Sequence, residues 1–295
     1  MSEKSNIEWT DATWTTITGC ARVSPGCANC YAERMTATRL REQPKYKGLA
    51  VITPAGEQHW TGEIRLHESE LATPLSWLKP RMVFVNSMSD TFHNDVPKYF
   101  LDRLFSFMAR CSQHTFQVLT KRAERMRDYM QSNLVAPPPN VWLCGAPPPN
   151  VWLGVSVEDQ KRADQRIPLL LQTPASVRFL SVEPLLSPIE LNVPAYVESG
   201  TWGMTVGPKC GLTARPWSPA TVDWVIVGGE SGPGARPCKV EWIRSVVQQC
   251  KAANVPCFVK QLGSALRRGK GGDMNEWPED LRVREFPTVQ TCSSS

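Results

Sequence analysis

Three cysteines near the N-terminus have the spacing in this chain that most directly indicates chemistry. Cys20, Cys27 and Cys30 lie in GCARVSPGCANCYAER, with six and then two residues between them. The Ser-Pro-Gly between the first two provides a turn that lets the chain fold back on itself. A closed zinc site and a [4Fe–4S] cluster both normally take four protein ligands, and the next histidine along the chain is His59. Three thiolates alone would leave one iron of a cluster open to a small molecule.

Radical enzymes use such an open iron to bind S-adenosylmethionine, so we expect a [4Fe–4S] cluster and S-adenosylmethionine as cofactors. Two alternatives stay open at this point. The three cysteines could belong to a zinc knuckle that a distant Cys111, Cys238 or Cys257 completes, or they could be unligated thiols.

Short β-branched runs alternate with helical patterns along the chain, which is typical of βα units and a parallel sheet. The predicted strands are Thr13–Thr18, Met82–Asn86, Phe116–Thr120, Val151–Val157, Val177–Val182, Trp224–Val227 and Pro256–Lys260. The predicted helices are Ala28–Arg41, Lys98–Cys111, Ala123–Ser132, Asp159–Leu171 and Glu241–Ala253. This alternation favours an α/β fold, a complete or partial (β/α) barrel of parallel strands, with a candidate eighth strand at Leu281–Phe286.

Loop insertions interrupt one barrel domain predicted at residues 1–262. Residues 43–73 are polar, and residues 191–221 are rich in Pro, Gly and Trp. Residues 263–295 are basic at first and then Ser-rich, so we predict a C-terminal tail that is partly disordered.

A ten-residue segment occurs twice in tandem. APPPNVWLCG at 136–145 is followed at once by APPPNVWLGV at 146–155. Only one copy can occupy a strand, so we assign the second copy to the barrel and the first to an extruded duplicate.

Polar side chains follow the predicted strands, where barrel enzymes gather their functional residues. The candidates for catalysis are Glu183, Lys121, Lys260 and His93. The candidates for binding the cofactor are Ser87, Asp90, Glu158, Gly228, Gly229, Glu230 and Ser231. Each glycine could equally serve a tight turn, and Lys121 with Arg122 could be either an anion clamp or surface charges.

The composition is that of an ordinary globular protein, 41% hydrophobic and 21% charged over 295 residues. No apolar run approaches the roughly 20 residues of a membrane helix. The N-terminus lacks a secretory pattern, so we expect the cytoplasm, where ten cysteines favour metal binding over disulfides. The net charge of +5 permits an anionic partner.

Seven stretches, taken in order, resemble the three-cysteine-motif phage-type protein family, a domain of unknown function related to radical S-adenosylmethionine enzymes. They are GCARVSPGCANCYAER, FVNSMSDTFHNDVP, LTKRAERM, NVWLGVSVE, VRFLSVEPLL, DWVIVGGESGPGARP and CFVKQLG. The resemblance implies a radical-enzyme barrel with Cys20, Cys27 and Cys30 as cluster ligands, and it implies no substrate. The best-known radical enzymes place fewer residues between their first two cysteines, and an aromatic residue where this chain has Asn29.

The leading functional hypothesis is an enzyme that cleaves S-adenosylmethionine reductively to a 5′-deoxyadenosyl radical. A reductant protein of flavodoxin or ferredoxin type would be its partner, and the phage-type resemblance and basic charge favour a nucleic-acid or nucleoside-derived substrate.

Two other functions stay open. One is a zinc-stabilised, phage-type nucleic-acid-binding protein without catalysis, with aromatic residues stacked on bases. Its stacking candidates are Trp9, Trp14, Trp60 and Tyr46. The other is a metal-free barrel enzyme that uses Glu158 and Glu183 as an acid–base pair.

Overall fold

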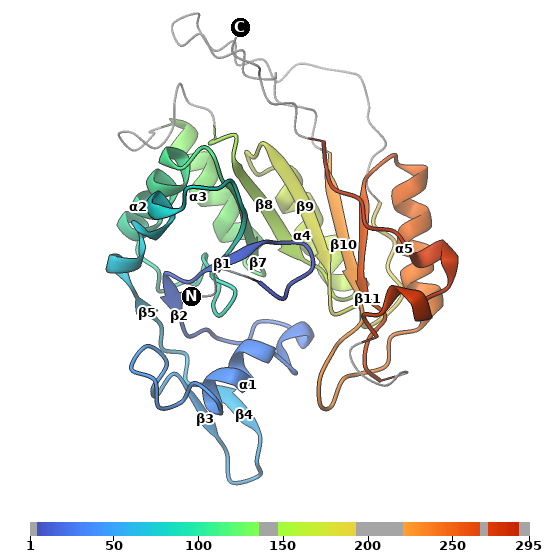
Figure 1. The fold of residues 1–295 in the computed structure, drawn as a ribbon, viewed down its shortest axis with the longest axis horizontal. Helices are drawn as coiled ribbons and strands as arrows, with labels where there is room; N and C mark the ends of the chain where they lie inside the picture. The colour runs from blue at the N-terminus through green and yellow to red at the C-terminus, as the bar shows by residue number, and fades with distance from the viewer. Residues whose placement is uncertain (1–4, 136–146, 193–220, 266–270, 289–295) are drawn as a thin grey trace, which may run out of the picture.

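The computed structural model describes residues 5–135, 147–192, 221–265 and 271–288, in which seven parallel strands curl into a half-barrel (Figure 1). The strands, in the order in which they pair, are β1 (Ala12–Trp14), β6 (Met82–Val85), β7 (Thr115–Thr120), β8 (Val151–Ser156), β9 (Val177–Val182), β10 (Trp224–Gly228) and β11 (Cys257–Gln261). Every neighbouring pair is parallel, and β1 and β11 are the two edges. The fold is therefore the partial form of the predicted barrel.

Helices cover the outer face of this sheet, as βα units require (Figure 1). They are α2 (Lys98–Arg110), α3 (Ala123–Val135), α4 (Gln160–Leu171) and α5 (Val240–Ala252). Alternate residues of β8 show how the core divides: Val151, Leu153 and Val155 pack in the cluster that contains the helices, whereas Trp152 belongs to a second cluster on the inner face. None of the described helices combines the length and apolarity that a membrane crossing needs.

Aromatic side chains fill the inner face beside the first half of β8, β9, β10 and β11. The ring centroid of Trp224 lies 6.0, 5.9 and 6.2 Å from those of Trp152, Phe179 and Phe258. Gly154 makes room for this cluster, because a Cβ there would lie 2.5 Å from the ring of Phe179. Polar side chains therefore gather at the other end of the barrel, where the carboxyl ends of the strands lie.

Two of the predicted base-stacking tryptophans are core residues instead. Trp9 is 3% exposed and packs edge-on against Trp224, and Trp14 is fully buried with its indole N–H donated to the carbonyl of Glu70. Neither ring is free to stack on a nucleic acid, so that prediction was wrong for both.

The first predicted strand, Thr13–Thr18, is broken in two. It gives β1 and the short β2 (Ile17–Thr18), and β2 pairs in antiparallel fashion with β5 (Arg65–Leu66). The cause is Asn86, whose Oδ1 accepts the backbone N–H groups of Thr16 and Ile17 at 2.8 and 3.0 Å. A side chain after β6 therefore takes the place of a strand neighbour.

The first helix is shorter than the predicted 28–41. The cysteine loop, residues 20–30, contains one 3-10 turn at Pro25–Cys27, and α1 (Tyr31–Ala37) begins only after Cys30. Helix α1 packs on a hairpin of β3 (Ala50–Ile52) and β4 (Gln58–Trp60), so the predicted insertion at 43–73 is structured.

The described residues after β11, 262–265 and 271–288, include a segment that packs against the barrel. The candidate eighth strand is a single antiparallel bridge between Phe258 and Arg284, so it is no barrel strand. Trp277 and Leu281 are buried in the main core, so the packed region extends beyond residue 262. The predicted duplicate at 136–145 and most of the predicted insertion at 191–221 lie outside the described residues.

Replacing Gly154 by Ala should lower the free energy of unfolding by about 1–3 kcal/mol, because the added methyl group overpacks the inner face against Phe179. Urea denaturation of both proteins measures this difference. Gly272→Ala is the matched control, since a Cβ at that position meets nothing within 4 Å. Equal stability of the two variants would contradict this packing.

Candidate functional site

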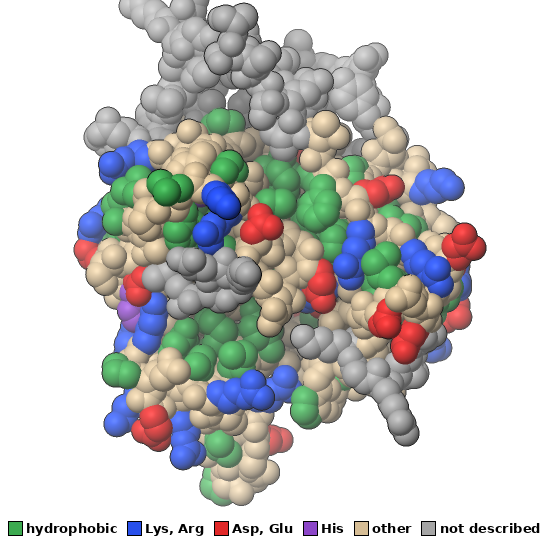
Figure 2. All heavy atoms as spheres, viewed as in Figure 1, with side chains coloured by type: hydrophobic (Ala, Val, Ile, Leu, Met, Phe, Trp, Pro, Cys, Tyr) green, Lys and Arg blue, Asp and Glu red, His purple; other side chains and the backbone are tan. Residues whose placement is uncertain are grey.

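A cavity of about 1070 Å³ opens at the carboxyl ends of the barrel strands. Cys20, Cys27 and Cys30 all line it, each of them half-buried. The strand-end residues in its lining are Ser87, Asp90, Lys121, Arg122, Ser156, Ser181, Glu183, Glu230, Ser231, Lys260 and Gln261. In Figure 2 hydrophobic side chains line a hollow on this face, and Lys and Arg side chains border its lower edge.

Strand-end side chains hold the cysteine loop over this cavity. The backbone N–H of Gly26 donates to Glu158 Oε1 at 3.2 Å, and the side-chain amide of Asn29 donates to Glu230 Oε2 at 2.9 Å. Gly26 permits the first contact, because a Cβ there would lie only 3.0 Å from the Glu158 carboxyl carbon.

A second set of contacts ties the loop to α1 and β4. The guanidinium of Arg22 forms a bidentate ion pair with Glu33, with a closest distance of 2.6 Å. The same buried carboxylate accepts the backbone N–H of Trp60 at 2.6 Å. Glu33 is 2% exposed, so this pair holds three segments of the chain together from within.

Glu158 supports the loop and does not face the cavity. It is fully buried, and its Oε2 accepts from Arg166 at 2.9 Å. Burial opposes ionisation, but Arg166 and the hydrogen bonds to the carboxylate outweigh it and hold the pKa of Glu158 below its ordinary value. Glu158 thus fits neither the predicted cofactor contact nor an acid–base pair with Glu183.

Glu183 and Lys260 meet inside the cavity, although they lie on different strands. Lys260 Nζ lies 2.7 and 2.9 Å from the two carboxylate oxygens of Glu183, and the amide of Gln261 donates to the same carboxylate at 3.0 Å. Glu183 and Lys260 are 17% and 19% exposed in their side chains. The structure therefore joins two predicted catalytic residues in one fixed, accessible ion pair.

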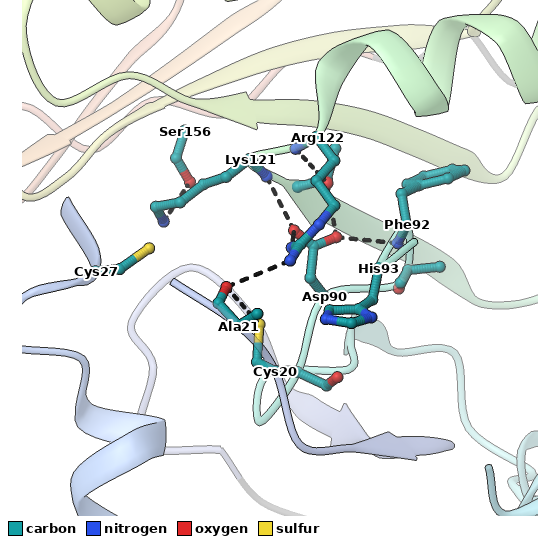
Figure 3. A network of polar contacts seen from close by, with 12 residues as sticks. Cys20, Ala21, Cys27, Asp90, Phe92, His93, Lys121, Arg122 and Ser156 are labelled. Atoms are coloured by element: carbon teal, nitrogen blue, oxygen red, sulfur yellow. Dashed lines mark hydrogen bonds and ion pairs between the residues drawn. The ribbon is translucent and has the colours of Figure 1, made fainter. Parts of the chain in front are cut away.

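Asp90 is the centre of a buried network at the end of β7 (Figure 3). Its carboxylate pairs with Arg122 Nη1 at 2.9 Å and accepts the hydroxyl of Thr120 at 2.6 Å. Arg122 also donates to the backbone carbonyl of Ala21 at 3.3 Å, next to Cys20. Because Asp90 is occupied by these partners, it positions the cysteine loop and has little capacity left to bind the predicted cofactor.

Lys121 extends along the same edge of the sheet, and its Nζ donates to Ser156 Oγ at 3.2 Å (Figure 3). No carboxylate of the described residues forms an ion pair with it. Lys121 therefore remains a cavity-lining cation, as its prediction as a catalytic residue requires.

His93 lies beside Asp90, on the side away from Cys27, and is not among the residues that line the cavity (Figure 3). It is 4% exposed, and its Nε2 has no hydrogen-bond partner among the described residues. Burial, and then the charge of Arg122, lower the pKa of His93, so the ring is neutral at physiological pH. The role of His93 as a catalytic proton donor stays a prediction, and the ring is buried outside the cavity lining in this structure.

Gly228 and Gly229 are needed for packing between strands. A Cβ on Gly229 would lie 2.6 Å from the carbonyl oxygen of Leu262, and one on Gly228 would lie 3.1 Å from that of Gln261. Neither glycine lines the cavity in this structure, and the approach of these backbones to a cofactor stays a prediction. The neighbouring Ser231 and Ser87 do line it.

The sulfur atoms of the loop influence one another. Burial, and then the charge of Asp90, raise the pKa of the Cys20 thiol to about 12, and an ionised Cys30 adds to this effect. Burial also raises the pKa of Cys30, with Cys27 contributing. Together the thiolates would repel one another, so a bound cation is what would make the ionised set stable.

The described residues contain no group of three His, Cys, Asp or Glu side chains arranged around a single metal ion. A tetrahedral zinc site, with bonds of about 2.3 Å to sulfur, needs such a group. In a [4Fe–4S] cluster each thiolate binds a different iron, which spaces the sulfurs more widely.

Three residues of the site gave no usable signal in the sequence. Arg166 reaches Glu158 from the second turn of α4, Asn29 reaches Glu230 across the cavity, and Arg34 lines the cavity from α1. Arg and Asn are common on helices and in loops, so only their spatial partners reveal a role. The one weak signal was the position of Asn29 between two of the cysteines.

The chain belongs to the family described as "Protein of unknown function (DUF5131)", whose match covers residues 4–280. The match spans the cysteine loop and every barrel strand, so the site described here belongs to the family's domain. No curated protein and no solved structure matches the chain.

Replacing Glu230 by Gln should lower the free energy of unfolding by about 1–3 kcal/mol at neutral pH, because Arg236 and Asn29 lose a buried ionic partner. These hydrogen bonds outweigh the opposing effect of burial and depress the pKa of Glu230. Its stabilisation is therefore present above the unfolded-state pKa of about 4.3 and is lost as the pH falls through the folded-state value.

Thermal melting of the wild type and Glu230→Gln between pH 3 and 7 measures this dependence. The difference in stability should shrink towards zero at the acidic end. Asp280→Asn, which removes an exposed partner of Arg244, is the control and should leave stability nearly unchanged. A difference that stays constant across the range would show that Glu230 does not act as a charge.

Proposed function

We propose that this chain is a phage-type radical S-adenosylmethionine enzyme whose cysteine loop holds a [4Fe–4S] cluster. The observation that carries the proposal is the position of Cys20, Cys27 and Cys30 in the lining of one cavity with the charged strand-end residues. In barrels of parallel strands this edge is where reactive groups gather.

The donor set fits a cluster with one open iron. The described lining contains three cysteines, no fourth cysteine and no histidine. Its strand-end carboxylates, Asp90, Glu183 and Glu230, each form an ion pair with an Arg or Lys. Those pairs make them poor candidates for a fourth ligand, so the open position remains for a small molecule.

When bound and reduced, such a cluster supplies the electron that cleaves S-adenosylmethionine into methionine and a 5′-deoxyadenosyl radical. The residues of this chain act around that reaction. Arg122 and Asp90 keep the Cys20 segment in place, and Lys121 provides a positive charge for a carboxylate group. The Glu183–Lys260 pair faces a substrate from the opposite wall of β9 and β11.

The proposed enzyme also needs an electron donor, and we propose the cytoplasm as its location. A flavodoxin- or ferredoxin-type protein in the cytoplasm would deliver the electron. The half-buried cysteines lie at the cavity surface, which is consistent with electron delivery from outside.

Anaerobic reconstitution with iron and sulfide should give a brown protein that cleaves S-adenosylmethionine when dithionite is added. Cys27→Ala should lose most of the iron and show no detectable cleavage, because one of three ligands is gone. Cys111→Ala removes a thiol that is buried outside the cavity and should keep both properties. Iron content, the visible spectrum and chromatography of the products report the result.

The metal content of protein purified without oxygen decides between the proposed enzyme and the zinc-stabilised binding protein. One zinc and no iron would contradict the enzyme, as would an iron-loaded protein that leaves S-adenosylmethionine intact.

A further inference from the structure

The cavity is extended, and its volume of about 1070 Å³ lies at the upper end of the roughly 300–1,000 Å³ range of ligand sites. The cysteines and strand ends form its inner part, whereas α1 and β4 form an outer wall. The residues of that outer wall are Tyr31, Arg34, Met35, Thr38, Arg39, Gln58 and Trp60.

The outer wall has positive charge that the protein does not neutralise. Arg34 and Arg39 form no hydrogen bond or ion pair through their guanidinium groups with any other described residue, in contrast to Arg122 on the inner side. Glu8 is the remaining carboxylate of the lining, on the exposed N-terminal segment. Two free guanidinium groups beside a cavity favour an anion, and the planar donor array of Arg suits phosphate in particular.

The guanidinium of Arg34 packs against the chain after β10, and none of its donors is used among the described residues. Its guanidinium lies against Gly232, where an added Cβ would be 2.7 Å from Nη2 and 3.0 Å from Nη1. Gly232 has a φ of +99°, so glycine both permits this backbone and leaves space for the guanidinium. Asn29 joins the same two segments by donating to Glu230 and to the carbonyl of Gly234. A positioned, half-buried cation with free donors is typical of a binding group.

Two aromatic side chains stand on the same wall. Tyr31 is 44% exposed and is fixed by the bond from its hydroxyl to the carbonyl of Ser87. Trp60 is half-buried and is fixed through its backbone N–H to Glu33. Exposed faces of fixed aromatic rings next to arginines are suited to stacking on nucleobases.

We propose that the outer part of the cavity binds a nucleotide, with its phosphate on Arg34 and Arg39 and its base against Tyr31 or Trp60. This proposal names a substrate class for the proposed enzyme. It rests on the proposed function only in assigning the inner part of the cavity to the cofactor. The same chemistry could come from a free nucleotide or from one unit of a single strand.

Fluorescence anisotropy of a labelled oligothymidylate, with reconstituted protein and S-adenosylmethionine present under nitrogen, tests the site. Arg34→Gln and Arg39→Gln should each weaken binding about tenfold, because a charge-assisted contact to phosphate is lost. Each should also reduce the salt dependence of the affinity by about one phosphate contact. Arg110→Gln makes the same change of charge on the exposed end of α2, outside the cavity, and should bind like the wild type.

Competition with thymidine monophosphate and thymidine identifies the source of the phosphate. If thymidine monophosphate displaces the labelled strand at a concentration similar to that needed by the unlabelled strand, the site binds a free nucleotide. If a much higher concentration of the monophosphate is needed, the site binds a nucleotide within a single strand. Thymidine competing as well as its monophosphate would overturn the phosphate site. So would the absence of binding by both probes, or equal losses in Arg34→Gln and Arg110→Gln.

The iron content separates this test from that of the proposed function. Arg34→Gln and Arg39→Gln should retain the iron, because neither guanidinium forms a hydrogen bond or ion pair with a described residue of the cysteine loop. Intact cleavage without nucleotide binding would overturn the nucleotide site alone. Nucleotide binding by a protein that takes up no iron on reconstitution would overturn the radical mechanism alone.

Discussion

Buried ionic contacts between the ends of the strands and the cysteine loop determine the rest of the site. The loop has almost no regular structure of its own, only the turn at Pro25–Cys27. It is held from below by Glu158 at Gly26 and by Glu230 at Asn29. Each of these carboxylates also has an Arg partner, so the cost of burying its charge is offset by a second set of hydrogen bonds. Without these contacts the three sulfurs would have no common position.

The interior of the half-barrel has two parts, an aromatic core and a polar cavity. Aromatic rings around Trp224 fill the space beside the first half of β8, β9, β10 and β11. Beyond them the strands end in Lys121, Glu183 and Lys260, which line the cavity. The same parallel sheet therefore supports a dry core at one end and a polar site at the other, as barrels of this type do.

Residues that look equivalent in the sequence have different tasks in the structure. Glu158 and Glu183 both follow a strand in the motif Ser-Val-Glu, yet Glu158 is sealed beneath the loop and Glu183 faces the cavity. His93 and Asp90 are three residues apart, yet only Asp90 reaches the lining. The two carboxylates differ in their partners. Glu158 forms a buried ion pair with Arg166 on α4, whereas Glu183 forms an ion pair with Lys260 on β11 at the cavity.

The sequence alone predicted a complete or partial barrel, six of its seven strands to within two residues and the outer helices, because alternation and local periodicity carry that information. It also predicted that Cys20, Cys27 and Cys30 gather with the strand ends, whereas the open form of the barrel came from the tertiary structure. Only the tertiary structure decided which polar residues face the cavity. It also decided where the first strand breaks, since Asn86 reaches Thr16 across 70 positions of the chain. Hydrogen bonds and ion pairs of this kind join residues that are distant in sequence, and no local pattern specifies them.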